Sequence, residues 1–250
     1  MGEPNVRATS SRGYEISYED AGAGPALVLV NGLTGTAAEW RELGFVDRLA
    51  VSHRVLSVDT LGHGLSAKPH DPQAYREPGV AADLIAAMDD AGVERAAVWG
   101  YSRGAWIACV CAIEFPDRVS SLIMGGEELT EPPSPDIPAW VEALVLGDWD
   151  AFWSSFPVEL SEYDRQQIAA NDPRAIGAAF IGGRQSPSPD LSRVHVPVLL
   201  YCGGGDDPQE MLPTAEALGV ELKIVGDGDH FQTFGEVDLL VPSVLAHLIG

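Results

Sequence analysis

The chain has 250 residues, a length that favours one large α/β domain and that suffices to bury a full hydrophobic core. Its net charge of −22 argues against nucleic acid and anionic membrane surfaces as partners, because both repel an acidic protein. A hydrophobic content of 46% is ordinary for a globular protein, and no apolar run approaches the ~20 residues that a membrane helix needs.

The three cysteines, Cys109, Cys111 and Cys202, all lie within apolar stretches. An odd number without framework spacing indicates reduced, buried thiols and no disulfide scaffold. The first residues contain no basic segment followed by an apolar one, so we expect no signal peptide. Together these features predict a cytoplasmic protein.

Strand and helix patterns alternate through the first half of the chain. We expect strands over residues 6–9, 14–19, 26–30, 54–58, 95–99 and 119–124, and helices over residues 37–50, 80–91 and 105–115. This alternation predicts a parallel sheet with right-handed crossovers, and the chemistry of such a sheet lies at the carboxyl ends of its strands.

The alternation stops after Gly126. A proline-rich segment is followed by four short helical patterns rich in Trp and Phe, over residues 139–146, 148–156, 161–170 and 172–182. Strands at 196–202 and 221–225 and helices at 209–218 and 237–248 then resume the pattern. The sequence thus predicts a core of residues 1–126 and 191–250. Residues 127–190 would form a helical lid over the active edge of the sheet, or else a peripheral decoration.

The segment Gly100-Tyr101-Ser102-Arg103-Gly104 lies between an expected buried strand and a helix. A serine on such a tight turn is held in a strained conformation, with its hydroxyl clear of the sheet at a helix N-terminus. Glycines at both ends avoid a collision between strand and helix. The pattern predicts Ser102 as a nucleophile, the alternative being a structural turn whose serine caps the helix.

Four motifs together resemble the α/β-hydrolase fold family: Asn31-Gly32-Leu33, Asp59-x-x-Gly62-His63-Gly64-x-Ser66, Gly100-x-Ser102-x-Gly104, and Gly203-x-x-Asp206 with His230. The resemblance covers the chain from about residue 14 to the end. It is to the small lidded members, which include esterases, lactonases and carbon–carbon bond hydrolases. It implies an α/β fold with a doubly wound, mostly parallel eight-stranded sheet and a small helical lid inserted after the sixth strand.

The base of the expected catalytic triad is His230. It follows a strand and a turn rich in glycine and aspartate, from which a side chain can reach the sheet edge. There it would accept the proton of Ser102 and then protonate the leaving group. The resemblance implies that His63, in its glycine-flanked loop, is structural.

The acid of the triad is predicted by the same resemblance at Asp206. Its role would be to orient the imidazole of His230 and to stabilise the imidazolium. Asp207 stays open because the family often has Asp-Pro at this point. Glu127 and Glu128 also stay open, because some members place the acid after the preceding strand.

The resemblance implies an oxyanion hole formed by the backbone N–H groups of Leu33 and Arg103. Asn31 stands where the family usually has histidine, either as a tolerated scaffold residue or as a substrate contact. The Arg103 side chain would either bind a substrate carboxylate or pair with an acidic residue such as Glu127 or with loop carbonyls.

The aromatic residues of the insertion would line an apolar substrate pocket or form plain helical core, and among them we assign Trp140 and Trp153 to substrate binding. No spacing typical of metal ligands and no cofactor motif is present, so we expect neither a metal nor a cofactor.

These motifs predict a serine hydrolase that cleaves a carboxylic ester or lactone of a small, fairly apolar substrate through an acyl-enzyme intermediate. A small molecule is the only partner expected, and the sequence indicates no oligomeric state. A carbon–carbon bond hydrolase, lyase or perhydrolase that uses the same triad remains open, as does a non-catalytic ligand-binding protein of this fold.

Overall fold

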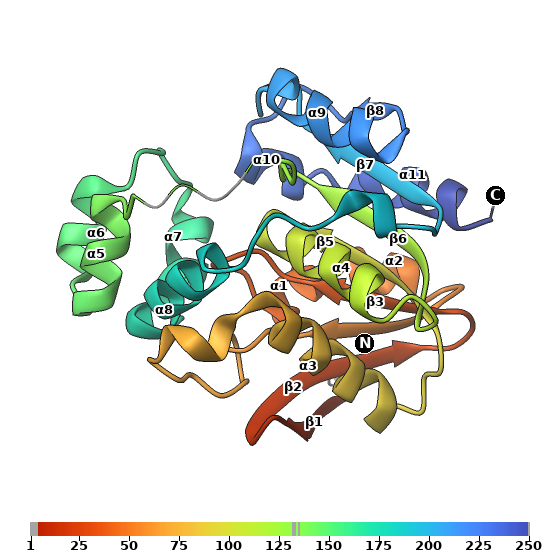
Figure 1. Ribbon diagram of the computed structural model, residues 1–250, viewed down its shortest axis with the longest axis horizontal. Helices are drawn as coiled ribbons and strands as arrows, with labels where there is room; N and C mark the ends of the chain where they lie inside the picture. Colours follow the sequence, from red (N-terminus) through yellow and green to blue (C-terminus); the bar gives the residue numbers. More distant parts are fainter. Residues whose placement is uncertain (1–4, 132–133, 135, 250) are drawn as a thin grey trace.

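A central sheet organises the molecule (Figure 1). Its strands are β1 (Val6–Ser11), β2 (Tyr14–Gly22), β3 (Ala26–Val30), β4 (Arg54–Val58), β5 (Ala96–Tyr101), β6 (Val119–Gly125), β7 (Val198–Cys202) and β8 (Leu222–Ile224). They lie in the order β1-β2-β4-β3-β5-β6-β7-β8 in this computed structural model, which describes residues 5–131, 134 and 136–249. The pairings of β2 with β1 and with β4 are antiparallel and the other five are parallel, so the predicted mostly parallel eight-stranded sheet is confirmed.

Helices cover both faces of the sheet, and this is why its inner strands are apolar on both sides. Leu27 and Leu29 of β3 face α1 (Ala37–Glu42), α2 (Phe45–Leu49) and α11 (Val237–Ile249). Val28 and Val30, one residue out of phase, face α3 (Glu77–Asp90) and α4 (Arg103–Glu114), because successive side chains of a strand point to opposite faces.

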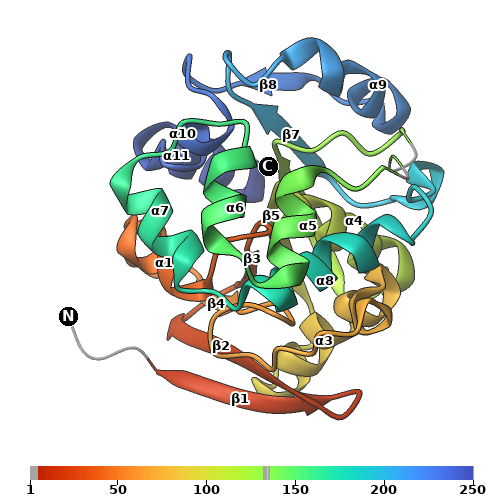
Figure 2. The same cartoon turned by 90° about the vertical axis from the view of Figure 1, so that its left-hand side faces the viewer.

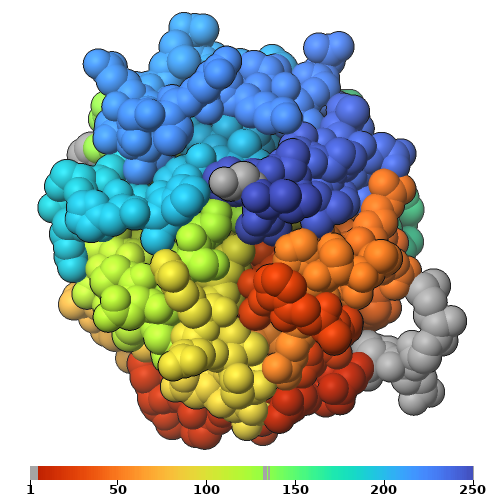
Figure 3. Space-filling view, turned by 90° about the vertical axis from the view of Figure 1, so that its right-hand side faces the viewer, coloured from red at the N-terminus to blue at the C-terminus, as the bar shows by residue number. Residues whose placement is uncertain are grey.

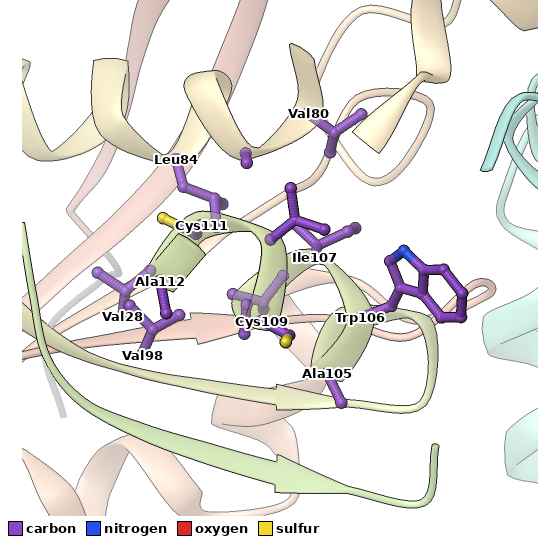
Figure 4. Packing of buried hydrophobic residues seen from close by; sticks show 14 of the residues in the cluster. Val28, Val80, Leu84, Val98, Ala105, Trp106, Ile107, Cys109, Cys111 and Ala112 are labelled. Carbon is purple, nitrogen blue, oxygen red and sulfur yellow. The ribbon is translucent and has the colours of Figure 1, made fainter. Parts of the chain in front are cut away.

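Helix α4 lies directly between the sheet and α3 (Figure 4). Ala112 lies beside Val28 on the sheet side, and Cys111 lies beside Leu84 of α3. Cys109, Cys111 and Cys202 are all buried and free, as their apolar surroundings in the sequence predict. Burial of this helix on two sides makes the start of α4 a rigid platform.

Two helical segments differ from the sequence-based expectation. The helix expected over residues 37–50 is divided, because Gly44 has a φ of 91° and starts α2 in a new direction. A short helix, α10 (His230–Phe234), precedes α11, and the Asp229 side chain caps it by accepting the N–H of Gln232.

The helical insertion contains α5 (Ala139–Leu146), α6 (Trp149–Ser155), α7 (Glu162–Ala169) and α8 (Pro173–Arg184). Asp148, Ser161 and Asp172 cap three of these helices, so local sequence signals define their starts. The insertion lies to the left in Figure 1 and faces the viewer in Figure 2. It has a small apolar core of its own around Phe152 and Ile168.

Helix α8 joins the insertion to the rest of the molecule. It packs against the short 3-10 helix η1 (Pro72–Tyr75) so closely that a Cβ on Gly182 would lie 2.2 Å from the Pro72 carbonyl oxygen. A second 3-10 helix, η2 (Leu191–Arg193), then leads the chain back to β7.

The face opposite the insertion is built from the parts of the chain that precede and follow it, from the red β1–β2 region to the dark blue α11 (Figure 3). The remaining helix, α9 (Pro208–Leu218), lies between β7 and β8 along the chain. Within the residues that the structure describes, every helix is too short or too polar to span a membrane.

Candidate active site

Ser102 occupies the sharp turn between β5 and α4. Its backbone has a φ of 52° and a ψ of −131°, a conformation that non-glycine residues rarely adopt. The flanking glycines are required by space: a Cβ on Gly100 would lie 2.0 Å from the Gly104 carbonyl oxygen, and a Cβ on Gly104 would lie 2.3 Å from that of Val30. The turn is further held by Ser102 N–H, which donates to the Gly125 carbonyl at 2.7 Å.

His230, the first residue of α10, is paired with Asp206 in the loop after β7. Its Nδ1 lies 2.9 Å from Oδ2 of Asp206. Because a carboxylate only accepts, Nδ1 carries the hydrogen, and Nε2 is left as a proton acceptor. Asp207 has a different contact, since its carboxylate accepts the N–H of Gln209 and caps α9. Of these two aspartates, the structure brings only Asp206 to the histidine.

The two glutamates after β6 also stand apart from this pair. Glu128 accepts the N–H of Thr130 at 2.6 Å and the hydroxyl of Thr214 at 2.7 Å, so both of its carboxylate oxygens already have partners. Glu127 hydrogen-bonds to none of the described residues, but it lines a cavity together with Ser102. Burial raises the pKa of Glu127 to about 7, an effect that nearby cationic groups only partly offset.

Opposing effects act on His230. Burial alone lowers its pKa, but the hydrogen bond and the negative charge of Asp206 raise it, and the charges of Glu127 and Asp229 add to this. The net result is a pKa above the ordinary value. Asp206 thus stabilises the imidazolium that forms when His230 takes up a proton.

Ser102 and His230 line one cavity of about 340 Å³ between the sheet edge and the helical insertion. We call it the apolar cavity, because much of its wall is formed by Leu33, Trp140, Phe156, Ile168, Phe180, Phe231 and Phe234. The assignment of Trp140 to the cavity thus agrees with its position. Trp153 does not line it: its ring stacks on Trp149 at 5.7 Å because both lie on one face of α6.

The loop after β3 carries Leu33 past Ser102 and is held from beneath by buried side chains. Asn31 is 1% exposed; its Oδ1 accepts the N–H of Thr60 at 3.1 Å, and its Nδ2 donates to the carbonyls of Gly32 and Gly35 at 2.8 and 2.9 Å. With these bonds Asn31 is directed into the loop, away from the apolar cavity.

His63 supports the same loop. Its Nε2 donates to the Leu33 carbonyl, while Nδ1 lies 3.0 Å from the hydroxyl of Thr60. Burial lowers the pKa of His63 to about 4, so its ring is neutral at ordinary pH. Among the described residues, the backbone N–H groups of Leu33 and Arg103 have no hydrogen-bond acceptor, which leaves both free for a ligand oxygen.

The Arg103 side chain pairs with Glu77, at the start of α3. Its Nη1 donates to Oε1 of Glu77 at 2.7 Å, and the two side chains are 13% and 2% exposed. Nη2 also donates to the Tyr75 carbonyl at 3.5 Å. The side chain thus pairs with an acidic residue and a carbonyl, as one of the two predictions has it, but the acidic partner is Glu77 and not Glu127. The sequence pattern predicts a start of α3 at residue 80 and leaves Glu77 in a loop. The helix instead begins at Glu77, and Pro78 fits there because proline is tolerated in the first turn of a helix.

A second cavity, also of about 340 Å³, lies on the other side of the nucleophile. It shares Leu33, Ser102 and Phe180 with the apolar cavity. Most of its other lining residues are of charged or polar type, Arg103, Glu77, Glu127 and Arg184 among them, and we call it the polar cavity. The sequence does not predict Arg184 as a site residue, because an arginine at the end of a helix carries no signal for a site.

No group of three or more His, Cys, Asp or Glu side chains is placed to hold a metal ion in residues 5–131, 134 and 136–249. The groups that meet at Ser102 are a hydroxyl, an imidazole paired with a carboxylate, and two free backbone N–H groups. Such an arrangement can activate a nucleophile and stabilise an oxyanion.

Comparison with known proteins identifies the family. Residues 25–152, more than half of the chain, match the family described as alpha/beta hydrolase fold. The protein belongs to the alpha/beta hydrolase fold family. The resemblance inferred from the four sequence motifs is thereby confirmed, and so is the fold class.

A related protein of Bacillus subtilis (strain 168) is 27% identical over 233 residues, which cover 83% of each chain; its name gives it as a candidate 2-succinyl-6-hydroxy-2,4-cyclohexadiene-1-carboxylate synthase. Other curated relatives, with epoxide hydrolases among them, match over only 34% to 50% of their own length.

Two solved structures of the same fold cover nearly the whole chain. An enol-lactonase from Burkholderia xenovorans LB400 has a TM-score of 0.83 at 22% identity, covering 98% of this chain and 100% of its own. An esterase from Thermogutta terrifontis has a TM-score of 0.81 at 21% identity, covering 99% and 98%. At these identities the two structures show a common fold.

Proposed function

We propose that the protein is a serine hydrolase that cleaves a carboxylic ester or lactone of a small, fairly apolar substrate. The observation that carries the proposal is the geometry at Ser102. The serine stands on a strained turn in one cavity with His230, whose Nδ1 is held 2.9 Å from Asp206. Membership of a family whose named relatives are largely hydrolases supports an enzyme of this class.

The mechanism follows from which atoms are free. Nε2 of His230 takes the proton as Oγ of Ser102 attacks the substrate carbonyl. The resulting oxyanion accepts the N–H groups of Leu33 and Arg103, which have no acceptor among the described residues. His230 then protonates the leaving alcohol, and water releases the acyl group from Ser102 by the same steps in reverse. Asp206 orients the imidazole and stabilises its positive charge.

The apolar cavity indicates the substrate. Its volume of about 340 Å³ admits a small molecule, and its aromatic walls favour an apolar group. The helical insertion, residues 127–190, contributes Trp140, Phe156 and Phe180 to this wall, so we propose that it acts as a lid. A small-molecule substrate is the only partner that the proposal requires, and three free buried thiols support a cytoplasmic setting.

The test is hydrolysis of a panel of p-nitrophenyl esters and of γ- and δ-lactones, with acyl chains of increasing length. The intact protein should turn over the short members, and Ser102→Ala should reduce kcat by at least about 10⁴-fold. Far-ultraviolet circular dichroism of both proteins controls for folding. Equal turnover by a folded Ser102→Ala protein would refute the serine mechanism.

A second candidate function uses the same serine for hydrolysis of a carbon–carbon bond or for a lyase reaction. The observation in its favour is Glu127, which lines the polar cavity with Ser102 and whose pKa burial raises to about 7. A carboxyl group of that pKa can deliver a proton to a departing carbon. Product analysis with a β-diketone and its matched ester separates the two: fragments from the diketone support this candidate, and cleavage of the ester alone supports the first.

A further inference from the structure

The polar cavity contains buried polar atoms that lack partners. Nε and Nη1 of Arg184, Nε of Arg103 and Nε1 of Trp106 are buried donors that have no hydrogen-bond acceptor among the described residues. Unpaired buried groups of this kind are rare in native proteins and destabilise the free state. Their concentration around one cavity next to the nucleophile indicates that a polar ligand group belongs there.

Arg184 provides the uncompensated positive charge of this cavity. The other guanidinium, that of Arg103, is already paired with Glu77. Arg184 forms no salt bridge with the described residues, and the ring of Phe180 lies 4.4 Å below its guanidinium carbon, which holds the planar group in place. Glu127 lines the same cavity, so a donor and an acidic group both face it.

We propose that the polar cavity is a carboxylate subsite, in which Arg184 binds a carboxylate on the arm of the substrate that extends away from the apolar cavity. The proposal rests on the function proposed for Ser102, since the two cavities meet at that residue. The substrate is then a two-armed ester or lactone with an apolar arm and an anionic arm. One carboxylate oxygen accepts from Arg184, and the other accepts from the protonated carboxyl of Glu127.

Four glutamates line the wall, so an anionic group has to bind beside Arg184 and away from the charged carboxylates. Glu77 is paired with Arg103, the oxygens of Glu128 accept from Thr130 and Thr214, and Glu131 is a further acidic group of the wall. Glu127 is faced by His230, Arg103, Glu77 and Arg184, and its raised pKa leaves much of it protonated at neutral pH. As the pH rises through about 7, Glu127 gains a negative charge beside the ligand, so the preference for a carboxylate should fall.

The test uses two pairs of esters, each an acid and its neutral amide isostere. In one pair the carboxylate lies on the leaving-group side of the scissile bond, and in the other it lies on the acyl side. One pair is 4-acetoxybenzoate and 4-acetoxybenzamide, and the other is monophenyl succinate and phenyl succinamate. At pH 6, the acid-to-amide ratio of kcat/KM should fall by about 10-fold to 100-fold in Arg184→Gln for one of the two pairs. Arg193→Gln is the matched control, because Arg193 is a surface residue paired with Glu114, and it should leave the ratio unchanged.

Two more variants keep the test informative. Arg184→Lys keeps the charge and should retain part of the preference, even if Arg184→Gln fails to fold. In Glu127→Gln the acid-to-amide ratio of kcat/KM should stay constant between pH 6 and pH 8, whereas in the unmodified protein it should fall. The titration of His230 affects both substrates alike, so it cancels in the ratio. Unchanged ratios for both pairs in folded Arg184→Lys and Arg184→Gln would overturn the proposal.

Binding separates this proposal from the proposed function. Calorimetric titration of Ser102→Ala with 4-acetoxybenzoate and 4-acetoxybenzamide needs no turnover. Tighter binding of the acid, lost in Ser102→Ala/Arg184→Gln, supports the subsite even if the serine mechanism fails. Equal binding of both compounds to Ser102→Ala, with equal binding of the succinate pair, overturns the subsite even if the hydrolase is active.

Discussion

Substitution of the Arg103 side chain should lower the folding stability of the protein strongly, while the hydrolysis of uncharged substrates should change little. The Arg103→Met variant leaves Glu77 without a partner at a position where its side chain is 2% exposed. A buried carboxylate that loses its cation costs about 3–5 kcal/mol of folding free energy, because neither water nor another charge replaces it. The oxyanion donor at this position is the backbone N–H, which the substitution keeps.

The pH dependence of this loss identifies its cause. Burial already raises the pKa of Glu77, and the charge of Arg103 holds it down. Without Arg103 the pKa of Glu77 in the folded protein rises further above its value in the unfolded chain. The folded form therefore loses stability as the pH increases from the unfolded-state pKa through the folded-state pKa of Glu77. Urea unfolding should therefore show a larger deficit for Arg103→Met at pH 8 than at pH 5, where Glu77 can take up a proton.

A double-mutant cycle completes the test. Arg103→Met/Glu77→Gln removes both charges and should recover at least about 2 kcal/mol of the loss at pH 8. The reasoning is refuted if Arg103→Met loses less than about 1 kcal/mol at pH 8, or if the double variant is no more stable than Arg103→Met. In the folded fraction, kcat/KM for p-nitrophenyl acetate should stay within about 10-fold of the unmodified protein, since the N–H donor remains.

Three further predictions concern the site. Asp206→Asn should lower kcat by about 10⁴-fold and move the acidic limb of the kcat/KM profile to lower pH, because Asp206 is the group that raises the pKa of His230. Stopped-flow measurements over a range of pH give both quantities, and a near-normal kcat would place the triad acid elsewhere. The folded-state pKa of His63 is lowered from 6.5 to about 4, so stability should fall by about 2 kcal/mol between pH 7 and pH 5 as the unfolded chain takes up the proton; urea unfolding of His63→Gln should lack this part of the slope. Gly104→Ala should abolish labelling of Ser102 by a fluorophosphonate, because the added Cβ would lie 2.3 Å from a carbonyl oxygen; labelling at the normal rate would show that the turn tolerates a side chain.

The parts of the fold that the sequence predicts are those governed by local pattern. Apolar runs such as residues 26–30 indicate buried strands because two helical layers cover both of their faces. The turn at Ser102 is predictable because only glycine fits at positions 100 and 104. The break at Gly44 is not predicted, because a single glycine within an apolar pattern does not specify its own φ.

Side-chain partners over long distances could not be predicted. Arg103 and Glu77 are brought together by the path of the loop before α3, and α8 packs so closely on the pair that a Cβ on Gly183 would lie 2.0 Å from the guanidinium. The choice between Asp206 and Asp207 also needed the structure. Asp207 adopts a φ of 38° that turns its carboxylate to the start of α9, a property that two adjacent aspartates in a loop do not reveal.

The account centres on Ser102 as the residue that becomes acylated. Rapid mixing with p-nitrophenyl acetate, quenched with acid and followed by peptide mass spectrometry, tests this directly. A burst of one p-nitrophenolate per protein, with one acetyl group on the peptide that contains Ser102, is the predicted result. Hydrolysis without a burst and without an acetylated Ser102 peptide, or an equal burst from Ser102→Ala, would contradict it.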